Sequence, residues 1–202
     1  EEFAAHLDRA REHIRPWVGP SFVTTDVDGA RATLQRYADA TARDGNRIFG
    51  IWADGTLVGG VMFVEFSAAA GTCEIGCWLE PAAEGRGLIT AACRMLLTYA
   101  FEERHLHRAE WRCRADNARS SAVAERLGMT LEGVLREAWK VGDISAQVHR
   151  QDGAELAAAE PRQGAGQGLR RHQTAVRIDV GEHHLGADVA GAVGGGQESD
   201  GG

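Results

Sequence analysis

The chain is expected to form one α+β sandwich, in which helices flank a mixed, mostly antiparallel sheet. Three observations predict this class: helical periodicity near the amino terminus, an Asp54-Gly55 turn between two apolar runs, and alternating strand and helix patterns thereafter. The predicted order is helix, helix, three antiparallel strands, helix, strand, helix and strand. A chain of 202 residues is long enough for one core and a tail.

Apolar residues at helical spacing predict two helices before the first strand. The first spans residues 2–14 and ends at Pro16 and Pro20. The second begins near Asp26 or Asp28, and its predicted apolar face carries Val27, Ala30, Leu34 and Tyr37.

Strand patterns follow, and two further helices interrupt them. The predicted strands are 47–53, 56–66, 72–79, 108–114 and 129–141. A helix is expected at about 88–104, with Leu88, Ala92, Met95, Leu96 and Tyr99 facing inward. Asp116 or Asn117 caps another helix, which ends at Gly128.

The sequence changes character after Asp143. Aromatic residues stop at Trp139, glycine and alanine become frequent, and only 174–180 resembles a strand. We therefore expect a domain at residues 1–143 and a low-complexity tail at 144–202. The tail is interpreted either as a disordered extension, with 174–180 returning as a substitute strand, or as the product of a frameshift.

Composition excludes several classes of function. The net charge of −7 argues against nucleic-acid binding, and no apolar run is long enough to span a membrane. The four cysteines lack metal-ligand spacing, so no metal site is expected and the thiols are interpreted as reduced and buried. No leader pattern precedes the first helix, and the expected location is the cytoplasm.

A glycine-containing loop joins a strand to a long helix at residues 78–90. Trp78-Leu79-Glu80-Pro81 ends the strand, and Glu84-Gly85-Arg86-Gly87-Leu88-Ile89-Thr90 opens the helix. Unpaired N–H groups at a helix N-terminus and a flexible glycine backbone suit a pyrophosphate. An ordinary strand-to-helix turn would show the same pattern. P-loop and dinucleotide signatures are absent.

The segment that begins Asp116-Asn117-Ala118-Arg119-Ser120 follows another strand directly. Asn117 is the natural helix cap, and its amide is also suited to an extended ligand with carbonyl and amide groups. Ser120 lies in the first turn, where its hydroxyl would reach the same cleft. Capping or solvation of these two side chains is the simpler alternative.

Taken together, the two loops resemble those of the GNAT acetyltransferases. The closest branch is the RimJ/RimL-type ribosomal-protein alanine N-acetyltransferases, and the resemblance covers residues 2–143. Further matching segments are Arg11–Val18, the hairpin at 50–63, Glu74–Pro81 and Asn117–Gly133.

This resemblance implies a fold with a splayed central strand pair and direct acetyl transfer from acetyl-CoA to a primary amine, without a metal. The backbone of Trp78 and Leu79 would bind pantetheine, and residues 84–90 would wrap the pyrophosphate. Asn117 would hold the pantetheine arm, while Ser120 would protonate the departing thiolate. The expected acceptor is the α-amino group of a protein or peptide, such as a ribosomal protein.

Two carboxylates are candidates for the general base. Glu74 is the first, because strand alternation places it on the face opposite Cys73, with Gly76 and Trp78. Glu137 is the second, because the last part of the family's sheet sometimes supplies a carboxylate. Each is equally compatible with a structural role. At the position where the family's last sheet region would supply its carboxylate, this chain has Trp139.

The chain also departs from the family pattern. Glu84 stands where the pyrophosphate loop usually has Gln or Arg, and the carboxylate would repel a diphosphate unless its side chain points away. The strand before the first helix and the last strand are both expected to be missing. Alternatives to the leading interpretation are a non-catalytic or defective acyl-CoA-binding protein and an acetyltransferase of a small-molecule amine. Monomer and homodimer both remain open.

Overall fold

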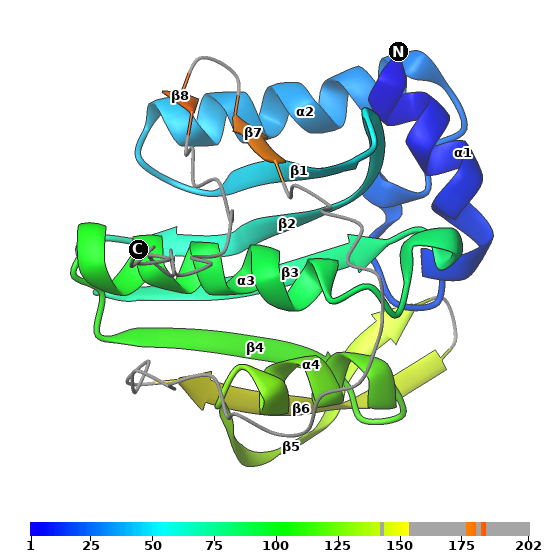
Figure 1. Cartoon of the computed structure of the whole chain (residues 1–202). Coiled ribbons are helices and arrows are strands. Elements are labelled where there is room, and N and C mark those ends of the chain that lie inside the picture. The colour runs from blue at the N-terminus through cyan, green and yellow to red at the C-terminus, as the bar shows by residue number, and fades with distance from the viewer. Residues whose placement is uncertain (142–143, 154–176, 181–182, 185–202) are drawn as a thin grey trace, which may run out of the picture.

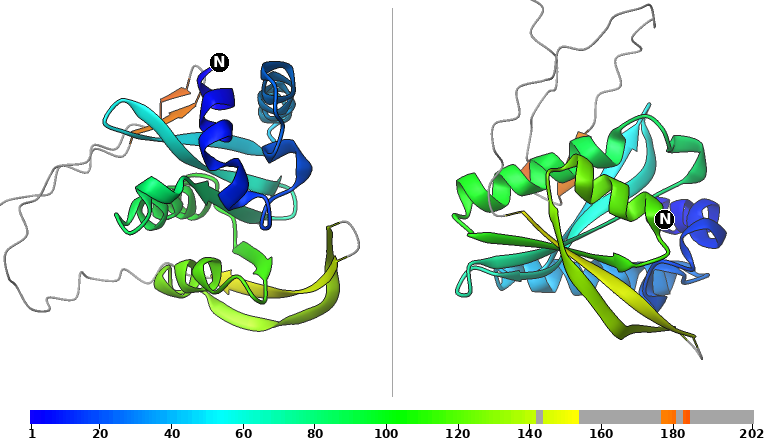
Figure 2. Two further views of the ribbon diagram at one scale, coloured as in Figure 1. Left: turned by 90° about the vertical axis from the view of Figure 1, so that its right-hand side faces the viewer. Right: turned by 90° about the horizontal axis from the view of Figure 1, so that it is seen from below.

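The computed structural model describes residues 1–141, 144–153, 177–180 and 183–184. A single mixed sheet forms its centre, with helices on both faces (Figures 1 and 2). Helices α1 and α2 lie against one face, and helices α3 and α4 lie against the other. The predicted α+β sandwich is therefore confirmed.

The strands follow the predicted positions closely through β4. Their order across the sheet is β5-β6-β4-β3-β2-β1-β7-β8, and all described neighbours pair antiparallel except β3 and β4. The strands are β1 (Arg47–Ala53), β2 (Thr56–Ser67), β3 (Thr72–Leu79), β4 (Arg108–Arg114), β5 (Thr130–Val141), β6 (Ile144–Gly153), β7 (Arg177–Val180) and β8 (His183–His184).

The helices also agree with the sequence patterns. Helix α3 continues into a π-helical segment, η3, and together they cover the predicted 88–104 helix. The helical elements are α1 (Glu2–Ile14), η1 (Pro20–Phe22), α2 (Val27–Ala42), η2 (Pro81–Ala83), α3 (Leu88–Thr98), η3 (Tyr99–Glu103) and α4 (Ala118–Arg126).

The larger core lies between the sheet and helices α3 and α4. Alternate residues of β3 and β4 point into it, including Cys73 and Ile75 on β3 and Trp111 on β4. Helix α3 buries Leu88, Ala92 and Leu96 here as predicted, together with Cys93 and Leu97. The predicted inward residues Met95 and Tyr99 are only partly buried. The four cysteines are free.

The second core lies between the sheet and α1. Phe3, Leu7, Ala10 and Ile14 of α1 pack on Met62 and Trp78. Helix α2 buries only part of the predicted face, since Ala30 is buried whereas Val27 is 41% exposed and Leu34 is 40% exposed. Its buried residues are Ala30 and Thr33, and the Thr33 hydroxyl donates to the Ser21 carbonyl, which satisfies the buried polar group.

The expectation that no strand follows Val141 is wrong. Strand β6 forms a hairpin with β5, in which Val141 pairs with Ile144, and it inserts between β5 and β4. The signal is weak because only Ile144, Ala146 and Val148 alternate with polar residues before the pattern ends. The low-complexity sequence beyond this short run obscured it.

Strand β7 pairs antiparallel with β1, so that Asp179 lies opposite Gly50. It therefore extends the sheet on the side of β1. Residues 177–180 agree with the predicted 174–180 strand, whereas 174–176 lie outside the described residues. Most of the tail lies outside the described residues. Its interpretation as a disordered extension or as a frameshift product therefore stays a prediction.

The parallel pair β3–β4 separates along its length. Its ladder extends only from Thr72 opposite Arg108 to Ile75 opposite Trp111. Beyond this point β3 remains paired with β2 as far as Leu79, and β4 remains paired with β6 as far as Arg114. The β3 edge that faces β4 is therefore without a ladder partner among the described strands from Gly76 onward (Figure 1).

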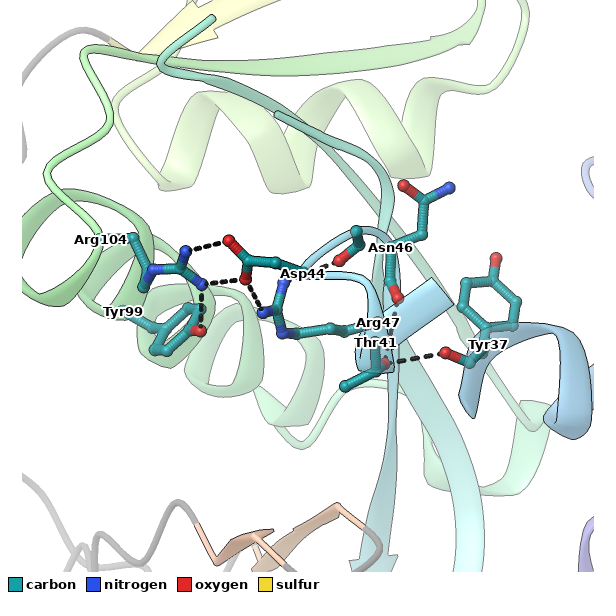
Figure 3. Close-up of polar contacts among 8 residues, drawn as sticks. Tyr37, Thr41, Asp44, Asn46, Arg47, Tyr99 and Arg104 are labelled. Atoms are coloured by element: carbon teal, nitrogen blue, oxygen red, sulfur yellow. Dashed lines mark hydrogen bonds and ion pairs between the residues drawn. The ribbon is translucent and has the colours of Figure 1, made fainter. Parts of the chain in front are cut away.

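An ionic cluster ties the α2–β1 loop to the end of η3 (Figure 3). The Asp44 carboxylate accepts from both terminal nitrogens of Arg104, at 2.8 and 2.6 Å, and from Arg47 at 2.6 Å. Hydrogen bonds from Arg104 and then from Arg47 lower the pKa of Asp44 to about 2. Arg104 also donates to the Tyr99 hydroxyl, so this cluster fastens the far end of the α3–η3 helix to the sheet.

Gly60 lies opposite Trp78 in the β2–β3 ladder, and a side chain there would overlap the indole ring. An added Cβ would also approach the Phe49 carbonyl oxygen to 2.7 Å. We predict that Gly60→Ala lowers the free energy of unfolding by about 2 kcal/mol or more, measured by urea denaturation. The control is Gly19→Ala, which meets nothing within 4 Å. Equal effects of the two substitutions would contradict this packing constraint.

Candidate functional site

A large open cavity lies where β3 and β4 separate. Its volume is about 1010 Å³, and its walls come from the α1–η1 segment, β3, the loop before α3, β4 and the start of α4. Most of the residues assigned from the sequence line it. These are Glu74, Trp78, Leu79, Glu84, Gly85, Gly87, Leu88, Ile89, Thr90, Asn117 and Ser120.

The loop before α3 exposes the helix N-terminus to this cavity. Gly85 has φ +74° and Gly87, the N-cap, has φ +75°, so both adopt the left-handed conformation that glycine favours. Gly87 supplies no side-chain cap, and the N–H groups of the first turn have no helical partners. The positive end of the helix dipole and these N–H groups together make a suitable site for an anion.

The start of α4 presents a polar group of different character. Asn117 Oδ1 caps the helix by accepting from the Ser120 N–H at 3.2 Å. Because the oxygen is engaged in the cap, the side-chain amide nitrogen is the group of Asn117 that remains to donate to a ligand. The capping and ligand-binding interpretations of Asn117 are thus compatible.

Ser120 is oriented by two neighbours on β4. Its Oγ accepts from Trp111 Nε1 at 3.0 Å, and indole is a donor only. The hydroxyl proton is therefore directed elsewhere. Burial raises the pKa of the Cys113 thiol, and a hydrogen bond with Ser120 partly offsets this rise. Ser120 therefore lies beside a sulfur atom of the cavity wall, and the indole N–H occupies one acceptor position of its hydroxyl.

Glu74 lies just before the point where the two strands separate. In the sheet it stands opposite Glu110 on β4 and Glu65 on β2, and its side chain is 14% exposed. Burial is the main reason that its pKa is raised, while Arg112, 3.5 Å away, lowers it and the two other glutamates raise it further. A carboxyl with a raised pKa in a cavity wall has the character of a proton acceptor.

Two further assignments from the sequence lie away from this cavity. Glu137 is exposed, has φ +53° at an irregularity of the β5–β6 pair, and is not part of the cavity wall. Arg86 is turned toward Asp54, with 3.5 Å between the charged groups. The side chain of Trp139 lies outside the described residues.

Buried polar groups fix the end of β3 to α1. His6 Nε2 accepts from Trp78 Nε1 at 2.8 Å, and His6 Nδ1 lies 2.6 Å from Glu80 Oε1. Because indole can only donate, Nδ1 must carry the imidazole proton and His6 is neutral. Burial accordingly lowers the pKa of His6, although Glu80 opposes this effect. Arg9 donates to the same Glu80 oxygen at 3.0 Å, which compensates the carboxylate.

Sequence reasoning missed the contribution of the amino-terminal segment and of β2 to the cavity. The cavity wall includes Trp17, which follows α1, Tyr37 of α2, and Met62 and Val64 of β2. The Tyr37 hydroxyl donates to the Met62 sulfur at 3.1 Å, and burial raises the pKa of the phenol. Their sequence positions carry no distinctive spacing, since they converge only when α1 and α2 fold onto the sheet.

Known proteins share this arrangement. Residues 1–130 match the family described as the acetyltransferase (GNAT) domain. The chain belongs to the GNAT acetyltransferases. Among relatives of this acetyltransferase is YdaF of Bacillus subtilis (strain 168), named for an inferred ribosomal N-acetyltransferase activity. It is 32% identical over 142 residues, which cover 68% of this chain and 75% of YdaF.

Two other comparisons support the same assignment. The ribosomal-protein-serine acetyltransferase of Escherichia coli (strain K12) is 33% identical over 130 residues, or 64% of this chain and 72% of that protein. The solved structure of Mycobacterium smegmatis RimJ in complex with CoA-disulfide has a TM-score of 0.70 and 25% identity, covering 78% of this chain and 79% of that one. The predicted relationship to RimJ/RimL-type enzymes is thus confirmed.

The described residues contain no helix that is long and apolar enough to cross a membrane. No group of three or more potential metal-ligating side chains of His, Cys, Asp or Glu occurs within the same part of the chain.

The neutral state of His6 predicts a pH-dependent stability. In the native protein its pKa lies below the ordinary value of about 6.5, so the unfolded chain binds more protons as pH falls below that value. Stability is therefore fully present above about pH 6.5 and declines toward the lowered native pKa. His6→Gln is expected to reduce the difference in unfolding free energy between about pH 7.5 and pH 5.5.

The matched control is His105→Asn, which removes an exposed histidine at a left-handed position that asparagine tolerates. Urea denaturation of wild type and both variants at the two pH values measures the effect. The same pH-dependent loss in His6→Gln as in wild type would show that His6 does not cause it.

Proposed function

We propose that this acetyltransferase transfers the acetyl group of acetyl-CoA to a primary amine, the α-amino group of a protein or peptide. The observation that carries the proposal is the course of the cavity. It runs from the exposed N-terminus of α3, along the unpaired edge of β3, to Glu74 and Ser120.

The residues present fit an acyl-CoA. Residues 84–90 offer a cradle of backbone N–H groups for the pyrophosphate, with Gly85 and Gly87 allowing close approach. The β3 edge at Trp78 and Leu79 supplies backbone groups for an extended pantetheine arm that carries amides. The Asn117 amide nitrogen donates to the same arm from the other wall of the cavity.

Positioning is the main contribution of these residues to the reaction. Holding the thioester beside an amine turns an encounter of two molecules into a single step within one complex. Backbone N–H groups at the separated strands polarise the thioester carbonyl and stabilise the oxyanion as the amine attacks. Acetyl-CoA supplies the activated acyl group, and the amide product forms as the carbon–sulfur bond breaks.

Glu74 and Ser120 move the protons. Glu74 accepts a proton from the acceptor ammonium, directly or through a water molecule, and burial, which raises its pKa, makes its carboxylate a stronger base. Ser120 donates its hydroxyl proton to the departing thiolate. This role is supported by the indole N–H that donates to the Ser120 hydroxyl oxygen and by the position of Ser120 beside the Cys113 thiol, whose pKa it lowers.

A protein N-terminus is favoured as the acceptor by the relatives. The Escherichia coli relative is named as a ribosomal-protein-serine acetyltransferase. In this chain Trp17, Tyr37, Met62 and Val64 give the cavity wall aromatic and apolar surface, which suits the first residues of a peptide. Acetylation of ribosomal proteins would place the enzyme in the cytoplasm.

The test measures acetylation of short peptides with a free N-terminal Ser or Ala by the full chain, with mass spectrometry locating the acetyl group. Formylated peptides and a polyamine serve as comparison acceptors. Product is expected on the free α-amine alone. Turnover of the polyamine but not the peptides would favour a small-molecule acetyltransferase, and acetyl-CoA binding without turnover would favour a non-catalytic protein.

The same assay tests Ser120. Ser120→Ala is expected to lower kcat about a hundredfold, because the thiolate then leaves without a proton donor, and to change the KM for acetyl-CoA little. Ser121→Ala is the control, because this neighbouring serine is outside the cavity wall. Similar kcat values for both variants would exclude Ser120 as the proton donor.

A further inference from the structure

Three side chains from separate elements meet at the rim of the cavity. Glu84, in the loop before α3, accepts from Arg119 of α4 at 2.9 and 3.3 Å. Its Oε1 also lies 2.7 Å from His13 Nε2 of α1. All three line the cavity and are partly exposed, with 27% of His13, 38% of Glu84 and 72% of Arg119 side-chain area accessible.

This arrangement resolves the difficulty that Glu84 posed in the sequence. Its carboxylate belongs to the loop proposed to wrap the pyrophosphate, where negative charge is unfavourable. The carboxylate is turned toward Arg119 and His13, whose N–H groups converge on one anionic group from two different helices. Such convergence is the geometry of an anion subsite, and here a carboxylate of the protein itself fills it.

We propose that His13 and Arg119 form a phosphate-binding subsite, which the Glu84 carboxylate occupies until acetyl-CoA binds. The inference rests on the proposed function and adds residues that the sequence analysis did not assign. The ligand group is a phosphate of the acyl donor, either in its pyrophosphate or in its 3′-phosphate.

Replacing the Glu84 carboxylate by a phosphate at Arg119 costs little free energy. Exposed ion pairs such as Arg119–Glu84 contribute little net stability, so their rupture costs little. A phosphate offers the guanidinium more oxygen acceptors and more negative charge than a single carboxylate. Glu84 then turns toward solvent, which removes it from the diphosphate.

The proposal fixes the sign of two effects. Glu84 competes with the ligand, so Glu84→Gln is expected to tighten acetyl-CoA binding by about threefold. Arg119 contacts the ligand, so Arg119→Gln is expected to weaken binding by about tenfold and to reduce its dependence on salt. If Glu84 only held the loop in place, Glu84→Gln would weaken binding instead.

Calorimetric titration of the full chain measures these affinities, with circular dichroism showing that each variant is folded. The matched controls are Arg31→Gln and Glu12→Gln, which remove the same charges from exposed i,i+3 ion pairs outside the cavity wall. Both controls are expected to bind as wild type does. Unchanged or weaker binding by Glu84→Gln, or a loss in Arg119→Gln no larger than in Arg31→Gln, would overturn the proposal.

Two further ligands distinguish the two possible sources of the phosphate, and distinguish failure of the subsite from failure of the proposed function. Dephospho-CoA retains the Arg119→Gln effect if the pyrophosphate is bound and loses it if the 3′-phosphate is bound. Inorganic pyrophosphate tests the subsite without the acyl donor. If wild type binds pyrophosphate more tightly than Arg119→Gln but does not bind acetyl-CoA, the subsite stands and the proposed function fails; equal pyrophosphate binding overturns the subsite.

Discussion

The separation of β3 from β4 is the constraint on which the rest of the site depends. Each strand is held by its outer neighbour, β3 by β2 and β4 by β6, while their mutual ladder ends at Ile75 and Trp111. The Trp78 ring, packed over Gly60 and hydrogen-bonded to His6, fastens the free part of β3 to α1. An unpaired strand edge is therefore held open within a rigid domain, where it is available to a ligand rather than to another strand.

The same separation gives the two sides of the sheet different tasks. On one side, α3 and α4 begin beside the gap and direct their N-terminal turns toward it, which provides N–H groups and the Ser120 hydroxyl. On the other side, Trp17 after α1 and Tyr37 of α2 add aromatic surface to the cavity wall that also contains Glu74. A thioester bound along the strand edge would thus meet an amine that arrives from the opposite face. The contacts of Glu84 at the cavity rim connect the two sides of the sheet, because they join α1, the loop before α3 and α4.

Much of the fold and of the candidate site could be predicted from the sequence because the relevant signals are local. The helices, strands β1 to β4, the Asn117 cap and the glycines at positions 85 and 87 all follow from periodicity, turn chemistry or capping. Contacts between distant segments could not be predicted. The pairing of His6 with Trp78, of Glu84 with Arg119 and of Trp111 with Ser120 depends on how layers pack. Strand β6 was missed because its short alternation lies beside low-complexity sequence, and Val27 and Leu34 were misassigned because α2 buries a different stripe.

The most direct test of the central claim is hydrogen–deuterium exchange of the full chain with and without acetyl-CoA, followed by peptide-level mass spectrometry. The account predicts that the ligand protects the amides of residues 76–79 of β3 that point away from β2 toward β4, and the amides in the first turn of α3, because these lack backbone partners until the ligand binds. Protection confined to other segments, with unchanged exchange in both of these, would contradict the assignment of the separated strands as the acyl-donor site.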